Sequence, residues 1–459
     1  MEILILVFQA VILTYFLFLN GFYTFFTLIS LVQVRNYYSR VTFQDIRSHL
    51  SPSYYRPITI VVPAYNEEST IINNLKSLLS LKYPQYEVVV VDDGSTDGTL
   101  QRLKKEFRLV ETQKPIKLVI SHKAIKKVYL SLDFGHLIVV HKENGGKTDA
   151  LNAGINASSY PLFCSIDADS ILDKEGLLRA ARQFVIDKRV ISTGGIIRVL
   201  NGSKVEKGEI VDYHPPRRMV ENFQVVEYIR GFLSGRTAWN YLGSLLIISG
   251  TFALFRKDLA IAVGGYRETV GEDMDLIVRF HKYCRENHIP YRILFVPDPV
   301  CYTQVPSDFK SLWKQRNRWQ RGLVDSLYFS RKMFLNPRYG TVGLFGVPYF
   351  LFVETLGPMV ELLGYVGFLL FLVFGVLNWT FALLFFVVAI LWAMWINIGS
   401  ILVDELLYKR YKRFRDVMKL CVFGLIEMLG YRQMISFFRF WASFQFRRKK
   451  WGKAKRGQI

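Results

Sequence analysis

Cysteines are few in this chain of 459 residues, and the common nucleotide-loop patterns are missing. The four cysteines (Cys164, Cys284, Cys301 and Cys421) stand apart without a Cys-x-x-Cys pair. This spacing indicates reduced structural thiols. The sequence has no Walker A spacing and no G-x-G-x-x-G after a first strand, which excludes a P-loop and a Rossmann dinucleotide site. Zinc-finger spacings and RNA-binding signatures are also lacking, so a nucleic-acid partner is not predicted.

Acidic residues are outnumbered by basic ones, with 38 Asp and Glu against 59 Lys and Arg and a net charge of +21. Such an excess suits nucleic acid, anionic lipid or an anionic substrate. The basic residues cluster beside apolar segments, at 35–40, 409–415 and 447–456. We therefore expect the lipid bilayer to be the partner of these clusters.

Apolar blocks at both ends predict membrane-spanning helices. Residues 1–34 are too long for a signal-peptide core and lack a cleavage pattern, which favours an N-terminal transmembrane anchor. Basic residues follow this anchor, so the next domain (35–335) is predicted to be cytoplasmic. Residues 336–446 are predicted to form C-terminal transmembrane and interfacial helices, followed by a basic cytoplasmic tail at 447–459. The expected location is the plasma membrane, with several passes.

The C-terminal block is consistent with either three or five spans in total. Arg338 and the cluster at 409–415 should both be cytoplasmic, which requires an even number of crossings between them. We interpret 342–357 as an interfacial or re-entrant helix, and 359–377 and 380–403 as spans. The following stretch to residue 446 carries four charged side chains and fits either a hairpin or an interfacial helix.

Between the apolar blocks, strands alternate with helices. Residues 58–62, 87–91, 136–141 and 160–166 read as buried strands, and 67–81 has apolar residues at helical spacing. This alternation predicts an α/β domain around a parallel sheet, with ligands bound beyond the carboxyl ends of its strands.

The rest of the domain is patterned less regularly. A basic segment at 101–134 resembles an insertion on the sheet edge, with no assigned role. We predict a strand at 190–199, a polar loop at 201–218 and a pair of strands at 245–255. Residues 222–239 are predicted to form a helix whose Tyr, Arg and Trp face the membrane or a partner.

Two carboxylates end the strand at 160–166. Asp167 and Asp169 are alternate residues of an extended segment, so their side chains can converge on one point. Hard oxygen ligands with open positions suit Mg²⁺ or Mn²⁺ carrying a phosphorylated substrate. The alternative interpretation is a helix cap after a strand.

Three further motifs carry candidate chemistry. Glycines beside Lys147 permit close approach to a phosphate, with the ammonium as counter-charge. Glu272 and Asp273 open a predicted helix, where a simple helix cap is the alternative. Gln315, Arg318 and Trp319 share one helical face, where a juxtamembrane basic belt is the alternative.

The ordered set of motifs resembles the processive family 2 glycosyltransferases, which are membrane synthases of cellulose, hyaluronan, chitin and poly-N-acetylglucosamine. The resemblance covers about residues 57–325 and rests on Pro63–Glu67, Asp92-Asp93, Lys147, Asp167-x-Asp169, Glu272-Asp273 and Gln315-x-x-Arg318-Trp319. It implies a GT-A, Rossmann-like cytoplasmic domain inserted between transmembrane helices. It also implies inverting transfer from UDP-GlcNAc or UDP-glucose to a growing β-linked polysaccharide, which is exported through the helices.

The same resemblance assigns the donor site. Ala64, Tyr65 and the pair Asp92 and Asp93 would hold the uracil, and Glu67 would lie near the ribose. Lys147 would lie near the diphosphate, where Asp169 and Asp167 would bind the Mg²⁺ or Mn²⁺ that bridges it.

It also assigns the catalytic and acceptor groups. Asp273, beside Glu272, would be the general base that deprotonates the acceptor hydroxyl. Gln315, Arg318 and Trp319 complete the binding set. Arg318 would stabilise the leaving UDP, and Trp319 would give the terminal sugar a face to stack on. The family usually has Thr where this chain has Gly271, which we expect to alter the loop more than the chemistry.

Two alternatives remain open. One is a non-processive membrane transferase that acts on a lipid acceptor. The other is a non-catalytic scaffold or transporter that retains the fold, although it would predict damaged motifs. Glu354 and Glu361 either line a channel or pack inside the bundle, and a small accessory membrane subunit is a further partner to consider.

Overall fold

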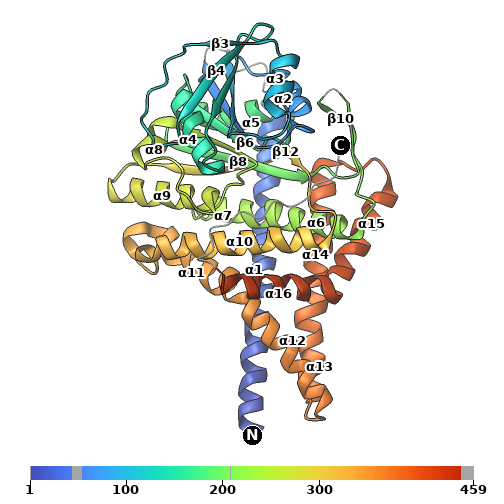
Figure 1. The fold of residues 1–459 in the computed structure, drawn as a ribbon. Coiled ribbons are helices and arrows are strands. Elements are labelled where there is room, and N and C mark those ends of the chain that lie inside the picture. The colour runs from blue at the N-terminus through green and yellow to red at the C-terminus, as the bar shows by residue number, and fades with distance from the viewer. Residues whose placement is uncertain (1, 44–53, 207, 446–459) are drawn as a thin grey trace.

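The computed structural model describes residues 2–43, 54–206 and 208–445, so the predicted tail at 447–459, with its basic cluster, lies outside the described residues. An α/β domain lies at one end of a bundle of long helices (Figure 1). Helix α1 (Glu2–Phe43) runs from the far end of this bundle up to the α/β domain. The predicted α/β class is confirmed.

The centre of the α/β domain is a sheet of ten strands within the described residues, in the order β3-β4-β5-β2-β1-β6-β11-β8-β12-β7. The strands are β1 (Ile58–Ala64), β2 (Tyr86–Asp92), β3 (Leu109–Thr112), β4 (Ile125–Ser131), β5 (Leu137–Lys142), β6 (Leu162–Ile166), β7 (Ile171–Leu172), β8 (Val190–Val199), β11 (Phe252–Arg256) and β12 (Arg292–Thr303). Strands β5, β2, β1 and β6 are parallel, as predicted. The parallel arrangement predicted from the alternation of strands and helices holds for these four strands. The complete sheet is mixed, because β11 runs antiparallel between β6 and β8 and β4 runs antiparallel to β5.

Helices cover the sheet and join it to the bundle. They are α2 (Ile71–Leu79), α3 (Thr99–Glu106), α4 (Lys147–Ala157), α5 (Gly176–Ile186), α6 (Met219–Tyr228), η2 (Ile229–Arg236), α7 (Thr237–Tyr241), α8 (Lys257–Ala262), α9 (Glu272–Glu286) and α10 (Phe309–Phe329). The helix predicted at 67–81 begins later, at Ile71. Its first residues form a turn in which the backbone N–H of Glu67 donates to the Thr99 hydroxyl.

Two irregular segments differ from the prediction. The pair of strands expected at 245–255 is a single strand, β11, preceded by a loop. Backbone groups of that loop bond to side chains and not to a neighbouring strand: His281 donates to the Leu245 carbonyl, and the Gly250 N–H donates to Asp273. The loop expected at 201–218 contains a short hairpin of β9 (Lys204–Glu206) and β10 (Glu209–Asp212).

The basic segment at 101–134 lies at the sheet edge, as predicted. It contributes α3 and the antiparallel edge strands β3 and β4. Part of this segment therefore has a structural role, because β3 and β4 extend the edge of the sheet.

After α10 the chain forms a series of mostly apolar helices. They are η3 (Arg331–Met333), η4 (Pro337–Tyr339), η5 (Val342–Gly346), α11 (Val347–Tyr349), η6 (Phe350–Thr355), α12 (Gly357–Val373), α13 (Trp379–Phe385), η7 (Phe386–Leu391), α14 (Trp392–Tyr408), α15 (Phe414–Ile426), η8 (Glu427–Tyr431) and α16 (Arg432–Ser443). Four helical stretches of the described chain are long and apolar enough to cross a membrane: Glu2–Ser39, Val342–Val373, Trp379–Tyr408 and Phe414–Ser443.

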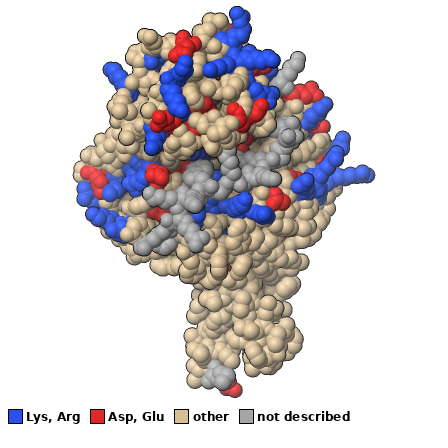
Figure 2. Space-filling view, in the orientation of Figure 1, with Lys and Arg blue, Asp and Glu red and all other residues tan. Residues whose placement is uncertain are grey.

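The four candidate spans are not arranged alike. Helices α1, α12 and α13 project away from the α/β domain, and the lower part of the molecule in Figure 2 is dominated by uncharged residues. The last stretch bends at Gly430, whose φ is 116°, and α16 then runs crosswise beneath α10 (Figure 1). This crosswise course is typical of an interfacial helix, one of the two forms predicted for this stretch.

Candidate active site

Lys147 and Asp167 meet at the carboxyl edge of the sheet. Asp167 follows β6, and Lys147 opens α4 directly after Gly146, whose φ of 90° favours glycine. The Lys147 ammonium lies 2.7 Å from Asp167 Oδ1 and 3.1 Å from Glu272 Oε1 at the start of α9. Burial lowers the pKa of Lys147, but the two carboxylates outweigh it and raise the pKa above its usual value. The ammonium therefore stays charged.

Glu272 and Asp273 lie side by side in sequence but differ in their contacts. Burial, reinforced by Asp273, raises the pKa of Glu272 against the opposing effect of Lys147. Asp273 accepts hydrogen bonds from the N–H of Gly250 (3.1 Å, to Oδ2) and of Met274 (2.8 Å, to Oδ1). These bonds hold the Asp273 carboxylate at the wall of a cavity.

Gly271 has a packing role that the sequence did not indicate. A Cβ added to Gly271 would lie 2.6 Å from the backbone of Gly322 on α10. The start of α9 therefore contacts α10 at backbone distance, and a Thr at this position would push the two helices apart. Gly271 therefore permits close helix packing directly beside Asp273.

Helix α10 contributes the predicted trio to the same cavity. Gln315 is buried, Arg318 is partly buried and the Trp319 indole is 43% exposed. The guanidinium of Arg316 lies 4.3 Å from the centroid of the Trp319 ring, and Tyr228 lies beside that ring at 6.4 Å between centroids. Trp319 is thus oriented by its neighbours and keeps an open face for a ligand.

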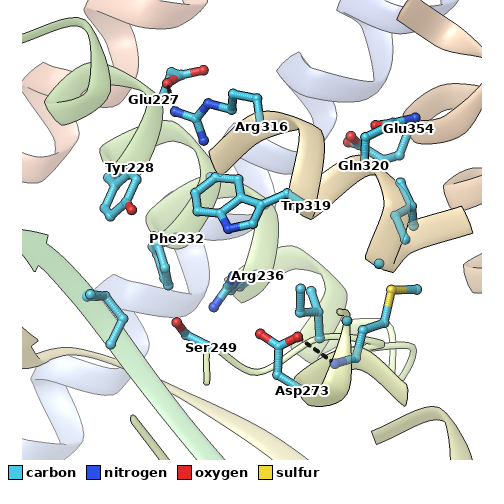
Figure 3. A pocket seen from close by; sticks show the side chains of 18 of the residues that line it. Glu227, Tyr228, Phe232, Arg236, Ser249, Asp273, Arg316, Trp319, Gln320 and Glu354 are labelled. Carbon is cyan, nitrogen blue, oxygen red and sulfur yellow. Dashed lines mark hydrogen bonds and ion pairs between the residues drawn. The ribbon is translucent and has the colours of Figure 1, made fainter. Parts of the chain in front are cut away.

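The cavity has a volume of about 440 Å³ and joins these groups to the candidate membrane helices. Its lining includes Lys147, Asp167, Glu272, Asp273, Gln315, Arg318 and Trp319, together with Tyr23 and Phe26 of α1, Ile396 of α14 and Arg432 and Arg439 of α16. Figure 3 shows the side chains converging on this space. One continuous hollow therefore connects the carboxyl edge of the sheet to the bundle.

The other predicted donor residues lie elsewhere. Asp92 is fully buried, accepts a hydrogen bond from the Ser95 N–H and pairs with His141 at 2.6 Å. Asp93 binds the Lys142 ammonium at 2.6 Å and the N–H groups of Gly145 and Gly146. These two carboxylates shape the loop that leads into Lys147.

The predicted uracil- and ribose-binding motif, Pro63–Glu67, lies at the end of β1. Ala64 is buried there, its carbonyl accepts the Asp93 N–H, and Tyr65 and Glu67 are partly exposed. Ala64, Tyr65 and Glu67 do not line the cavity that holds Asp273, and neither do Asp92 and Asp93. Their role in holding uracil and ribose stays a prediction.

Asp167 and Asp169 are the residues that could hold a metal ion. Asp169 is buried beside Ser170, and Asp167 is partly exposed to the cavity. No group of three or more His, Cys, Asp or Glu side chains in the described residues could hold an ion alone. Mg²⁺ bound together with phosphates needs only one or two carboxylates. Asp167 lines the cavity and Asp169 does not, so metal binding by the pair stays a prediction.

Several cavity residues escaped the sequence prediction. Glu227, Tyr228 and Arg236 come from α6 and η2, a segment predicted only as a helix whose Tyr, Arg and Trp face the membrane or a partner. The concentration of Tyr and Arg in this segment was the one signal available. Trp239, the tryptophan of that prediction, is buried in the protein.

A mixed sheet with acidic groups beyond its strands, opening toward apolar helices, defines a GT-A glycosyltransferase fold. Residues 59–264 match the model of Glycosyl transferase family 2, and residues 162–403, more than half of the chain, match that of Glycosyl transferase family group 2. The chain therefore belongs to the family 2 glycosyltransferases.

Individual relatives agree with this assignment. The chain is 29% identical over 265 residues to a poly-beta-1,6-N-acetyl-D-glucosamine synthase of Staphylococcus aureus (strain COL), covering 58% of this chain and 54% of the relative. It is 27% identical over 267 residues to the synthase of Staphylococcus epidermidis, with the same coverage. The chain spans about half the length of the curated relatives it matches.

One solved structure shares the fold over most of the chain. It is the mannosyltransferase PcManGT from Pyrobaculum calidifontis in complex with GDP-Man and Mn²⁺, with a TM-score of 0.54 and 18% identity, covering 92% of this chain and 99% of that one. At this identity the similarity shows the fold alone.

Proposed function

We propose that this protein is an inverting, metal-dependent, processive hexosyltransferase of the plasma membrane. It polymerises a UDP-sugar into a β-linked polysaccharide and exports the product through its helices, with the catalytic domain on the cytoplasmic side. UDP-GlcNAc is the first donor to test, because the matched curated relatives are poly-N-acetylglucosamine synthases.

The observation that carries the proposal is the position of Asp273. Its carboxylate is fixed by two backbone N–H groups at the wall of a cavity that extends to α1, α14 and α16. An acceptor in this cavity would present a hydroxyl to Asp273 and stack a sugar ring on Trp319. The rest of the chain would extend toward the membrane helices, which is the direction export requires.

The chemistry is a single displacement. Asp273 takes the proton from the acceptor hydroxyl while its oxygen forms a bond to the anomeric carbon. The bond from that carbon to the phosphate oxygen breaks, and UDP leaves with the electron pair. Lys147 and Arg318 lie where positive charge would favour the departing diphosphate.

Asp167 and Asp169 would hold a divalent ion, Mg²⁺ or Mn²⁺, as GT-A enzymes commonly require. When bound, the ion supplies counter-charge to the diphosphate. The Lys147 ammonium lies against Asp167 in the structure, so this carboxylate already has one cation beside it. This contact supports the proposal that cations gather at the carboxyl edge of the sheet.

The test is UDP release by the purified protein in lipid with Mg²⁺ or Mn²⁺ across a panel of UDP-sugars, followed by sizing of the product. We expect turnover with one donor and a long polymer. A single-sugar lipid product would replace the synthase with a lipid transferase, and no release with any donor would contradict the proposal.

The Asp273→Asn variant tests the proposed role of Asp273 as the general base. It should lower the rate of transfer by about 10²- to 10⁴-fold while leaving UDP binding intact, because the amide cannot accept the proton. Asp258→Asn, at an exposed position on α8, is the matched control and should keep full activity. Loss of UDP binding in Asp273→Asn would remove this residue from the base role.

A further inference from the structure

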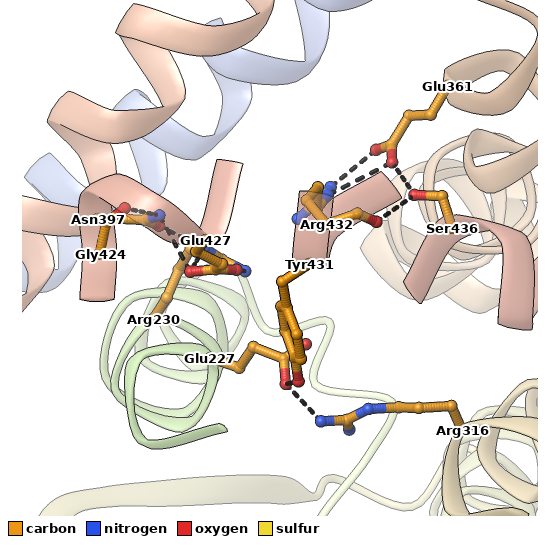
Figure 4. A network of polar contacts seen from close by, with 10 residues as sticks. All are labelled: Glu227, Arg230, Arg316, Glu361, Asn397, Gly424, Glu427, Tyr431, Arg432 and Ser436. Carbon is orange, nitrogen blue, oxygen red and sulfur yellow. Dashed lines mark hydrogen bonds and ion pairs between the residues drawn. The ribbon is translucent and has the colours of Figure 1, made fainter. Parts of the chain in front are cut away.

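The arginines that line the cavity are mostly neutralised by the protein itself. Four of them form ion pairs: Arg230 with Glu427 (3.0 Å), Arg316 with Glu227, Arg432 with Glu361 (2.7 Å) and Arg439 with Glu354 (2.9 Å). Figure 4 shows the first three of these pairs. Arg318 also interacts within the structure. These five guanidinium groups therefore all interact with other groups of the protein.

Arg236, the last residue of η2, is different. Its Nη1 is buried and makes no hydrogen bond to any described residue. The guanidinium lies over the ring of Phe232, 3.9 Å from the ring centroid, and no ion pair joins it to an acid in the described part of the chain. A buried charged donor without a partner is costly. Because the Arg236 side chain lines the cavity, a ligand oxygen there that accepted a hydrogen bond from the guanidinium would be bound favourably.

The groups around Arg236 indicate what kind of ligand atom its guanidinium could bind. In Figure 3, Arg236, Ser249, Asp273 and Trp319 surround the same space, although they come from η2, the loop before β11, α9 and α10. Burial lowers the pKa of Arg236 to about 10 against the opposing effect of Asp273, so the guanidinium is charged at neutral pH. Beside Asp273 a neutral oxygen is favoured over an anionic group, for which Lys147 and Arg318 offer positive charge elsewhere in the same cavity.

We propose that Arg236 is an acceptor-binding residue whose guanidinium donates a hydrogen bond to a neutral oxygen of the terminal sugar, a hydroxyl or an amide carbonyl. This inference rests on the proposed function and adds a contact to its acceptor site. The bond orients the sugar under Trp319 so that the neighbouring hydroxyl faces Asp273.

The test is direct binding of a β-linked GlcNAc oligosaccharide to the full-length protein in lipid, followed through Trp fluorescence or calorimetry. Arg236→Gln should weaken binding by about 10- to 100-fold, the size expected for a lost charge-assisted hydrogen bond. Arg236→Lys, which keeps a charged donor, should recover part of the affinity. The affinity for UDP should be unchanged in both variants. Arg218→Gln, at the exposed start of α6, is the control and should bind as the parent does.

Equal oligosaccharide affinity in Arg236→Gln and the parent would overturn the inference. A positioning role through Asp273 would give a different signature: a lower kcat with an unchanged acceptor KM. That result would also overturn it. Failure of the proposed function is distinguishable, since the parent itself would then release no UDP from any UDP-sugar.

Discussion

Arg198 and Asp404 join the catalytic domain to a candidate membrane helix through a buried ion pair. Arg198 on β8 donates to both oxygens of Asp404 on α14, at 2.8 and 2.6 Å, and the two side chains are only 3% and 2% exposed. Asp404→Asn preserves the shape and removes the negative charge, which leaves the guanidinium buried and unpaired. We expect this change to lower the free energy of unfolding by about 3–5 kcal/mol.

The assay is chemical unfolding of the purified variants in mixed micelles. Asp258→Asn breaks the more exposed pair between Arg256 and Asp258 and should cost no more than about 1 kcal/mol. The double change Arg198→Met with Asp404→Leu removes both charges, so most of the stability should return. If Asp404→Asn cost no more than Asp258→Asn, the pair would not stabilise the domain interface and the reasoning from burial would be wrong.

Three further changes test the site and its support. Asp169→Ala should abolish the part of UDP binding that depends on Mn²⁺, and unchanged titrations with and without Mn²⁺ would refute a role in metal binding. Trp319→Ala should impair polymer elongation more than donor hydrolysis, whereas equal losses would count against sugar stacking. His281 lies buried between the Leu245 carbonyl and the Tyr291 hydroxyl, and burial lowers its pKa to about 4 from 6.5. Its contribution to stability is present above pH 6.5 and is lost as pH falls toward about 4, because the unfolded state binds the proton first. Unfolding should therefore become easier by about 2 kcal/mol from about pH 7.5 to about pH 5. An equal loss in His281→Gln would assign the effect to other groups.

The sequence predicted the parts of the fold that depend on local pattern. Strands β1, β2, β5 and β6 are runs of apolar residues that are buried on both faces, so their sequence alone indicates a central sheet. Because strands in register end together, the polar residues that follow them meet at one edge. This logic anticipated the approach of Lys147 to Asp167.

What escaped prediction depends on contacts between distant segments. The loop before β11 was expected to be a strand, but Asp273 and His281 bind its backbone from α9. Arg236 enters the cavity because η2 packs between α1 and β8, which no periodicity in 222–239 could indicate. The backbone contact of Gly271 with Gly322 likewise joins residues far apart in the sequence, so it depends on the fold.

Helix α10 physically connects the catalytic groups with the helices of the bundle. Gln315 and Trp319 face the cavity, and Gly322 touches Gly271 one residue before the acidic pair of α9. Gln320, which also lines the cavity, accepts a hydrogen bond from Arg439 of α16 at 2.9 Å. Through these contacts α10 touches both α9 and α16, so we expect a displacement of α16 to shift α10 as well. Such a shift would move Trp319 relative to Asp273, and the proposed sugar transfer would then depend on the position of α16.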